Sequence, residues 1–188
     1  MLKTTGKFEI PYYIYRPENT VELKNKILEV LQDSPGGKIL KDMENVYKSD
    51  WHTNKDVNYF QKNFVDANTN NYYKILSPYV DEIVTDLTKF NKDSIFRITQ
   101  GWFHQYYKLN YYDYHEHLGI RWAIIYYAEL PIDGPKTEFE NFFGNPIKLD
   151  VNEGDFLVFS GWLKHRSPPN LSAKRKTIIA LNVAEFKK

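Results

Sequence analysis

The stretch IFRITQGWFHQ, residues 95–105, opens the half of the chain that decides the fold. From here to the end of the sequence, apolar and polar residues alternate with a period near two, which is typical of β-strands. Turn-forming stretches rich in Pro, Gly, Asn and Asp interrupt the pattern. The pattern predicts short strands at residues 95–105, 112–118, 122–130, 146–149, 155–159, 164–167 and 176–183. Such a series favours a sandwich or a jelly roll.

The residues before this half predict two helices. Apolar residues with helical spacing over residues 23–31 predict a helix that ends before the turn-forming residues 34–37. A second helix is expected from a cap at Ser77, with Pro78 at its first position, to about Asn91. Both helices are expected to support one face of the β half.

Two further segments complete the expected organisation. FEIPYYIY, residues 8–15, predicts a short strand. Residues 37–71 hold no period and are expected to form a long loop with short helical pieces, which is a candidate substrate lid. We therefore predict one domain over residues 1–188, in which residues 1–93 give helical and loop support and residues 94–188 form a jelly-roll core. The expected fold class is α+β, mainly β.

Composition and charge exclude several classes of protein. The 188 residues are 42% hydrophobic and 26% charged, which is the balance of one ordinary domain. A formal net charge of +1 argues against a nucleic-acid partner. The chain has no cysteine, which excludes disulfides, thiolate metal sites and a cysteine nucleophile. The sequence shows neither a secretory signal nor an apolar run long enough for a membrane span, so we expect a cytoplasmic protein with no membrane partner.

Two histidines of the β half have the spacing of metal ligands. His115 and His117 are separated by one residue, so on a strand both side chains project from one face and can bind the same ion. A third ligand must come from another strand, and His165 is the candidate because it follows the apolar strand at residues 155–159. Two alternatives stay open: the pair consists of surface or hydrogen-bonded histidines, or Asp113 joins His115 as a ligand.

A basic residue with an anion-binding pattern lies near the end of the chain. Arg175 follows His165 by ten residues and shares one strand face with Thr177. Inside an apolar barrel, a guanidinium and a hydroxyl form a bidentate anchor for a small carboxylate. Because no acidic residue lies on the same face of this strand, we expect a ligand to supply the negative charge. Candidates for the pocket wall alternate on the first core strand: Gln100, Trp102 and His104.

These motifs resemble those of the Fe(II)- and 2-oxoglutarate-dependent oxygenases, in particular the prolyl-4-hydroxylase-like branch. The resemblance covers residues 95–184 and is carried by YDYHEH at 112–117, EGDFLVF at 153–159 and RKTIIALN at 175–182. It implies a double-stranded β-helix of the jelly-roll or cupin-like type, with Fe(II) and 2-oxoglutarate as cofactors. It also implies that the C5 carboxylate of 2-oxoglutarate pairs with Arg175.

The resemblance further implies a reaction and its participants. His115, His117 and His165 match the iron ligands and are the catalytic centre that the family would have here. The reaction uses O₂, releases succinate and CO₂, and hydroxylates a peptidyl side chain, an amino acid or a small metabolite, with ascorbate helping to maintain activity. Four more residues are implied as cofactor contacts: Thr177, Tyr112, Tyr127 and Asn182.

One residue departs from the family pattern. His117 stands where these oxygenases usually carry an acidic ligand, so three neutral imidazoles replace two imidazoles and a carboxylate. This departure favours two alternatives, which are a cupin-like metal-binding protein and a three-histidine dioxygenase that does not use 2-oxoglutarate. The sequence leaves the substrate open, and a barrel of this kind works as a monomer or a homodimer.

Overall fold

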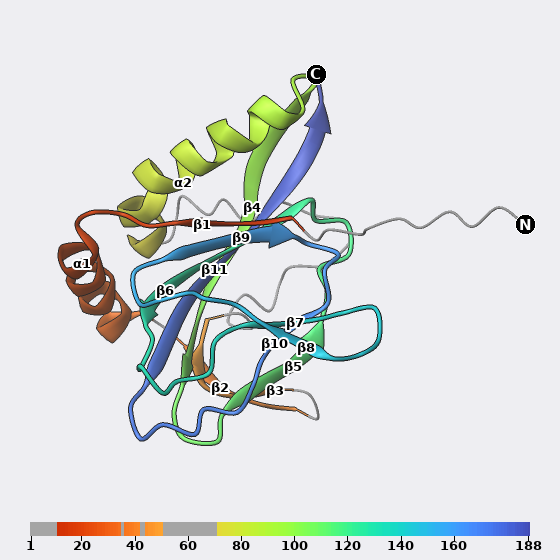
Figure 1. Cartoon of the computed structure of the whole chain (residues 1–188). Coiled ribbons are helices and arrows are strands. Elements are labelled where there is room, and N and C mark those ends of the chain that lie inside the picture. Colours follow the sequence, from red (N-terminus) through yellow and green to blue (C-terminus); the bar gives the residue numbers. More distant parts are fainter. Residues whose placement is uncertain (1–10, 35, 42–43, 51–70) are drawn as a thin grey trace, which may run out of the picture.

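A curled antiparallel sheet with helices on one face makes up the computed structural model, which describes residues 11–34, 36–41, 44–50 and 71–188 (Figure 1). The helices are α1 (Thr20–Asp33) and α2 (Asn71–Phe90). Neither of them, and no other helical segment of the described ranges, has the length and apolar character that a membrane crossing requires. The strands are β1 (Tyr12–Tyr15), β2 (Gly37–Lys41), β3 (Glu44–Ser49), β4 (Ser94–Tyr106), β5 (Tyr111–His115), β6 (Trp122–Glu129), β7 (Glu138–Glu140), β8 (Pro146–Lys148), β9 (Phe156–Ser160), β10 (His165–Ser167) and β11 (Lys176–Lys187).

The strand order divides the sheet into two halves. β1, β9, β6, β11 and β4 lie side by side in that order, and the helices pack against this half. β3, β5, β10, β7 and β8 continue from β4, and β2 pairs with β3. In Figure 1 the second half lies below the first, so the sheet curls like half a barrel. This confirms the expected jelly-roll class, mainly β with supporting helices.

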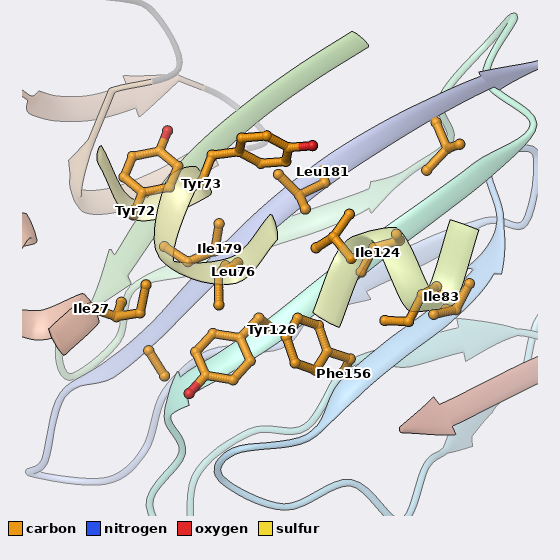
Figure 2. Close-up of a cluster of buried hydrophobic side chains, with 14 of the residues drawn as sticks. Ile27, Tyr72, Tyr73, Leu76, Ile83, Ile124, Tyr126, Phe156, Ile179 and Leu181 are labelled. Atoms are coloured by element: carbon orange, nitrogen blue, oxygen red, sulfur yellow. The ribbon is translucent and has the colours of Figure 1, made fainter. Parts of the chain in front are cut away.

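Strand β6 shows why the central strands have nearly continuous apolar sequences. Successive side chains point to opposite faces of a strand, so β6 contributes to two cores. Ile124 and Tyr126 pack with Leu76 of α2 on the helix side (Figure 2). Ile125 and Tyr127 face the second core, between the two halves of the sheet. A strand that is buried on both faces carries few polar residues.

Helix α2 begins earlier than its sequence signals predict. It starts at Asn71, and Pro78 lies inside it. Tyr72 is buried in the helix-side core, and this burial stabilises helical turns before the expected cap. Pro78 has no N–H to donate to the carbonyl of Lys74, and the hydroxyl of Ser77 donates to that carbonyl instead, at 3.0 Å. Ser77 therefore compensates for a missing backbone hydrogen bond and does not cap the helix.

Other differences concern the expected loop and the strand edges. β2 and β3 form a hairpin within the segment that was expected to be a loop, and β3 pairs with both β4 and β5. Residues before 94 thus add strands to the core sheet and do not only support it. β7 is an additional short strand, and β5 ends at His115, two residues before His117. Residues 51–70, the centre of the candidate lid, lie outside the described residues.

Candidate metal centre

Three histidines meet in the second half of the sheet. His115, the last residue of β5, lies opposite His165, the first residue of β10. His117 follows β5, and its backbone N–H donates to the carbonyl of Gly161 at 2.7 Å, which ties this turn to the segment before β10. The ring centroid of His165 lies 4.3 Å from that of His115 and 5.1 Å from that of His117. One potential ligand atom from each ring lies within 4.8 Å of the other two.

The Nδ1 atom of each ring is held by an oxygen acceptor. Nδ1 of His115 and of His165 lie 2.8 Å and 2.7 Å from the carbonyl oxygens two residues earlier in the chain. Nδ1 of His117 lies 2.7 Å from Oδ1 of Asn182. Each acceptor requires a proton on Nδ1, so in the neutral form of each ring Nε2 keeps its lone pair. The three Nε2 atoms are therefore the atoms that can bind a metal.

Burial keeps these imidazoles in the neutral form. Desolvation lowers the pKa of His115 to about 4 and the pKa of His165 well below its usual value. Burial also lowers the pKa of His117, although its hydrogen bond to Asn182 opposes this. Neutral imidazole is the form that binds metals, and three such nitrogens fit a borderline divalent cation such as Fe(II).

Asp113 does not take part in this cluster. Within the described residues the group that can hold a metal consists of histidines alone. The Oδ1 atom of Asp113 instead accepts a hydrogen bond from the backbone N–H of Tyr114 at 2.7 Å. The structure therefore does not bring Asp113 together with His115 as a metal ligand, as one of the alternatives required.

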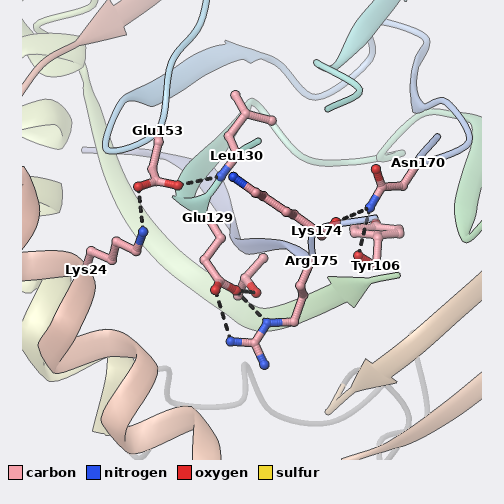
Figure 3. Close-up of polar contacts among 9 residues, drawn as sticks. Lys24, Tyr106, Glu129, Leu130, Glu153, Asn170, Lys174 and Arg175 are labelled. Carbon is pink, nitrogen blue, oxygen red and sulfur yellow. Dashed lines mark hydrogen bonds and ion pairs between the residues drawn. The ribbon is translucent and has the colours of Figure 1, made fainter. Parts of the chain in front are cut away.

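Arg175 does not face the interior, contrary to the expectation from its sequence. Its Nε and Nη2 atoms donate to the two carboxylate oxygens of Glu129 at 2.6 and 3.0 Å (Figure 3). Thr177 donates to the same carboxylate. Glu129 belongs to β6 and lies opposite Thr177, so the acidic partner comes from the neighbouring strand. The guanidinium and the hydroxyl do share a face, but the carboxylate of Glu129 already pairs with both groups.

The next residue, Lys176, faces the interior instead. Its side chain is completely buried, and its Nζ donates to Oγ of Ser167 at 2.8 Å. Among the described residues, no carboxylate lies within ion-pair distance of this ammonium group. Burial lowers the pKa of Lys176 to about 7, against the opposing influence of Glu138. Strand alternation is the signal that could have identified it, because Ile178, two residues later, faces the interior core.

The other expected cofactor contacts have different surroundings. The ring of Tyr112 packs edge-on against that of His115, with centroids 4.2 Å apart. Tyr127 is completely buried, and its hydroxyl donates to Oγ1 of Thr137 at 2.6 Å. Asn182 contacts the triad through His117. Tyr112 and Asn182 therefore belong to the surroundings of the histidines, whereas Tyr127 lies beside the ammonium group of Lys176, with its ring centroid 5.9 Å from Nζ.

The candidate wall residues of β4 lie near this centre, and Trp102 contacts one of its rings. The indole of Trp102 stacks on the ring of His117, with centroids 5.9 Å apart and an interplanar angle of 18°. The Nε1 of Trp102 donates to Nε2 of His104 at 2.8 Å. The carboxamide of Gln100 accepts a hydrogen bond from Asn182 at 2.7 Å. All three side chains project from the same face of β4, as their alternation predicted.

Comparisons with known proteins find the same architecture in enzymes of one kind. No family model and no curated protein matches the sequence. A prolyl hydroxylase from Trichoplax adhaerens, solved with a peptide fragment of hypoxia inducible factor, superposes with a TM-score of 0.65 at 15% identity over 92% of this chain and 83% of its own. A prolyl-4-hydroxylase from Pseudomonas putida gives a TM-score of 0.65 at 12% identity, covering 93% of this chain and 92% of its own.

A third solved structure holds both a metal and 2-oxoglutarate. HygX from Streptomyces hygroscopicus, with nickel and 2-oxoglutarate bound, has a TM-score of 0.64 at 8% identity over 93% of this chain and 83% of its own. Identities this low establish the fold and leave the chemistry to the residues of the site. The chain has the double-stranded β-helix fold of the prolyl hydroxylases and other 2-oxoglutarate- and Fe(II)-dependent oxygenases.

Proposed function

We propose that the protein is an Fe(II)- and 2-oxoglutarate-dependent oxygenase that binds iron through His115, His117 and His165. The observation that carries this proposal is the combination of three converging neutral imidazoles with a buried cation, Lys176, in one interior. Three protein ligands leave coordination positions for a chelating ligand and for O₂. A buried ammonium group with no carboxylate partner in the described part of the chain is suited to an anionic ligand.

We assign the C5 carboxylate of 2-oxoglutarate to Lys176 instead of Arg175. Ser167, the hydrogen-bond partner of Lys176, lies two residues after His165 on β10, which corresponds to about 7 Å along a strand. A five-carbon dicarboxylate can span such a separation, with its keto-acid end at the metal. The rings of Tyr106 and Tyr127 lie 5.3 and 5.9 Å from Nζ of Lys176, and they exclude water from the charge pair.

The protein residues have three tasks in the proposed reaction. Iron and 2-oxoglutarate, when bound, supply the oxidation of a C–H bond together with O₂, and succinate and CO₂ are released. The histidine rings present their Nε2 atoms because their Nδ1 atoms are already occupied. Lys176 and Ser167 fix the distal end of the cofactor. Tyr112 packs against His115 and restricts the orientation of that ring.

We propose hydroxylation as the outcome, with a peptidyl side chain, an amino acid or a small metabolite as the substrate. Two solved neighbours support this range, since one holds a peptide fragment and another holds hygromycin B. The hairpin of β7 and β8 is proposed to contact the substrate, because β7 pairs with β10 and the tip exposes Phe142 and Phe143. Stimulation by ascorbate, a cytoplasmic location and a monomeric or homodimeric state stay predictions.

A cofactor-turnover assay tests the proposed function. Protein supplied with Fe(II), 2-oxoglutarate and O₂ is expected to form succinate above the rate of a His165→Ala variant, even without the unidentified substrate. Succinate is measured by mass spectrometry with isotopically labelled 2-oxoglutarate. Iron-loaded protein that forms no more succinate than the variant would contradict the proposal.

A second candidate function follows from His117. Three neutral ligands without a carboxylate are also compatible with a dioxygenase that does not use 2-oxoglutarate. In that case Lys176 would hold the carboxylate of the substrate itself. The same assay separates the two functions, because this candidate predicts bound iron without succinate formation.

The buried Lys176 predicts a pH-dependent stability. Its pKa is lowered to about 7 in the folded protein without ligand, whereas an exposed lysine has a pKa of about 10.4. Between these values only the unfolded chain holds the proton, so stability increases as the pH rises through this window. Below this pH window, folding buries the charged ammonium group, and the full free-energy cost of its desolvation lowers the stability of the fold.

Replacing Lys176 with methionine removes this cost. We expect the Lys176→Met variant to be more stable than the wild type near pH 6, and the difference to shrink as the pH approaches 10. Urea unfolding of both proteins at a series of pH values gives the difference in free energy of unfolding directly. A difference that stays constant across the series would show that the pKa of Lys176 is not lowered.

A further inference from the structure

His117 is held in a different way from the other two histidines. His115 and His165 are bonded to carbonyl oxygens of their own strand segments, two residues earlier. His117 lies beyond the end of β5, and its Nδ1 is bonded to a side chain 65 residues away, that of Asn182 on β11. The orientation of this one ring therefore depends on a distant residue.

The carboxamide of Asn182 is itself fixed by a second contact. Its Nδ2 donates to Oε1 of Gln100 on β4 at 2.7 Å, and Gln100 lies directly opposite it in the strand pairing. Since Nδ2 is the donor in this bond, Oδ1 is the atom that faces His117. An amide oxygen can only accept, so Nδ1 of His117 must carry a proton, and in the neutral ring Nε2 then holds the lone pair.

The backbone at this position is also irregular. The pairing of β11 with β4 shifts register between Asn182 and Val183, so that Thr99 is an extra residue on β4. The hydroxyl of Thr99 donates to the backbone carbonyl of Asn182 at 3.3 Å. Irregularities of this kind re-aim side chains next to functional sites. Asn182 is 3% exposed, so its polar atoms depend on these protein partners.

We infer that Asn182 is a positioning residue that holds the ring of His117 in the orientation that presents Nε2 to a metal, and that Gln100 keeps Asn182 in place. This rests on the proposed metal centre and differs from the direct cofactor contact that the sequence resemblance implies for Asn182. Trp102 restrains the same ring from its face, through the stacking described above. The relay from Gln100 to Asn182 to His117 contains no acidic residue.

The relay predicts the effects of two substitutions of Asn182. Asn182→Leu keeps the branched shape but removes the acceptor, and we expect it to weaken Co(II) binding about 10- to 100-fold, the usual effect of losing such a partner. Asn182→Asp keeps an acceptor and adds a negative charge, which raises the basicity of the ring. This variant should bind Co(II) at least as tightly as the wild type and should have a lower Fe(III)/Fe(II) reduction potential.

Gln100 provides a conservative rescue. Gln100→Leu removes the acceptor for Nδ2 of Asn182 and should weaken Co(II) binding in the same direction as Asn182→Leu. Gln100→Glu keeps an acceptor at this place and should bind Co(II) within about 3-fold of the wild type, since it preserves the outer hydrogen bond. Thr99→Val is the matched control, because it alters the same strand pair without touching the imidazole.

Co(II) binding is measured with the full chain by titration of the visible absorption, and folding of each variant is checked by circular dichroism. His117→Ala separates the inference from the proposed function. If His117→Ala binds Co(II) like the wild type, the metal centre itself is wrong. If His117→Ala binds weakly while Asn182→Leu matches Thr99→Val, the positioning role is overturned. Should Asn182→Leu fail to fold, equal affinities of Gln100→Leu and Gln100→Glu overturn it.

Discussion

Replacing Lys176 with methionine is expected to weaken 2-oxoglutarate binding by about 100-fold or more, because a charge-assisted hydrogen bond in a buried site contributes about 1.5–3 kcal/mol and truncation of a buried pair costs about 2–5 kcal/mol. The side chain is completely buried and its Nζ bonds to Ser167. Methionine fills the same volume without a charge, so the fold is expected to persist.

The matched control is Arg175→Met, which makes the same substitution one residue earlier. Adjacent residues of a strand face opposite sides, and Arg175 is occupied by Glu129 on the outer side. This variant is expected to bind 2-oxoglutarate within about 3-fold of the wild type. A partly exposed ion pair contributes little free energy, and this pair lies on the face opposite to Lys176. Isothermal titration calorimetry with the Mn(II)-loaded proteins gives both affinities. Loss of binding in Arg175→Met with retention in Lys176→Met would restore the assignment that the sequence alone favours.

The second large effect concerns His165. Removing one ligand from the triad is expected to lower the affinity for Fe(II) or Co(II) by about two to three orders of magnitude. The binding free energy of a structural zinc site, about 10–16 kcal/mol, is shared among a few ligands, and each ligand therefore contributes several kcal/mol. His165 is close to both other ligands, with its ring centroid 4.3 Å from that of His115 and 5.1 Å from that of His117. Metal content after dialysis, measured by mass spectrometry, reports the loss in His165→Ala.

His104 supplies the control for this prediction. It is a buried histidine of the same interior, but it does not belong to the metal-binding group of the described residues. His104→Gln keeps an acceptor for the indole of Trp102 and should retain the metal at the wild-type level. If His104→Gln loses the metal and His165→Ala keeps it, the three ligands are assigned wrongly.

The sequence predicts the β half well because its signals are local. Nearly continuous apolar runs mark the strands that are buried on both faces, such as β6, and turn-forming residues separate the strands. The triad is predictable for the same reason. The spacing of His115 and His117 restricts them to one region, and His165 follows a clear strand.

The predictions from sequence are wrong where the orientation of a residue or the bounds of an element depend on pairing between distant segments. Whether Arg175 or Lys176 faces the interior differs by one residue of register, and such a shift exchanges the two faces of a strand. Glu129, which determines the outcome, is 46 residues from Arg175. Helix α2 likewise begins before the expected cap at Ser77, because tertiary burial of its first turns outweighs the local signal of Pro78. Strands β2 and β3 lack an apolar period of their own: β3 is defined by its pairing with β4 and β5, and β2 by its pairing with β3.

The most direct test of the proposed site is the visible spectrum of the anaerobic wild-type protein after Fe(II) and 2-oxoglutarate are added in turn. Chelation of iron by the keto acid at the histidine triad predicts a weak charge-transfer band that requires both additions, persists in Arg175→Met, and is lost in Lys176→Met at limiting 2-oxoglutarate. Iron that binds to the triad but gives no band at saturating 2-oxoglutarate would contradict the proposed use of 2-oxoglutarate.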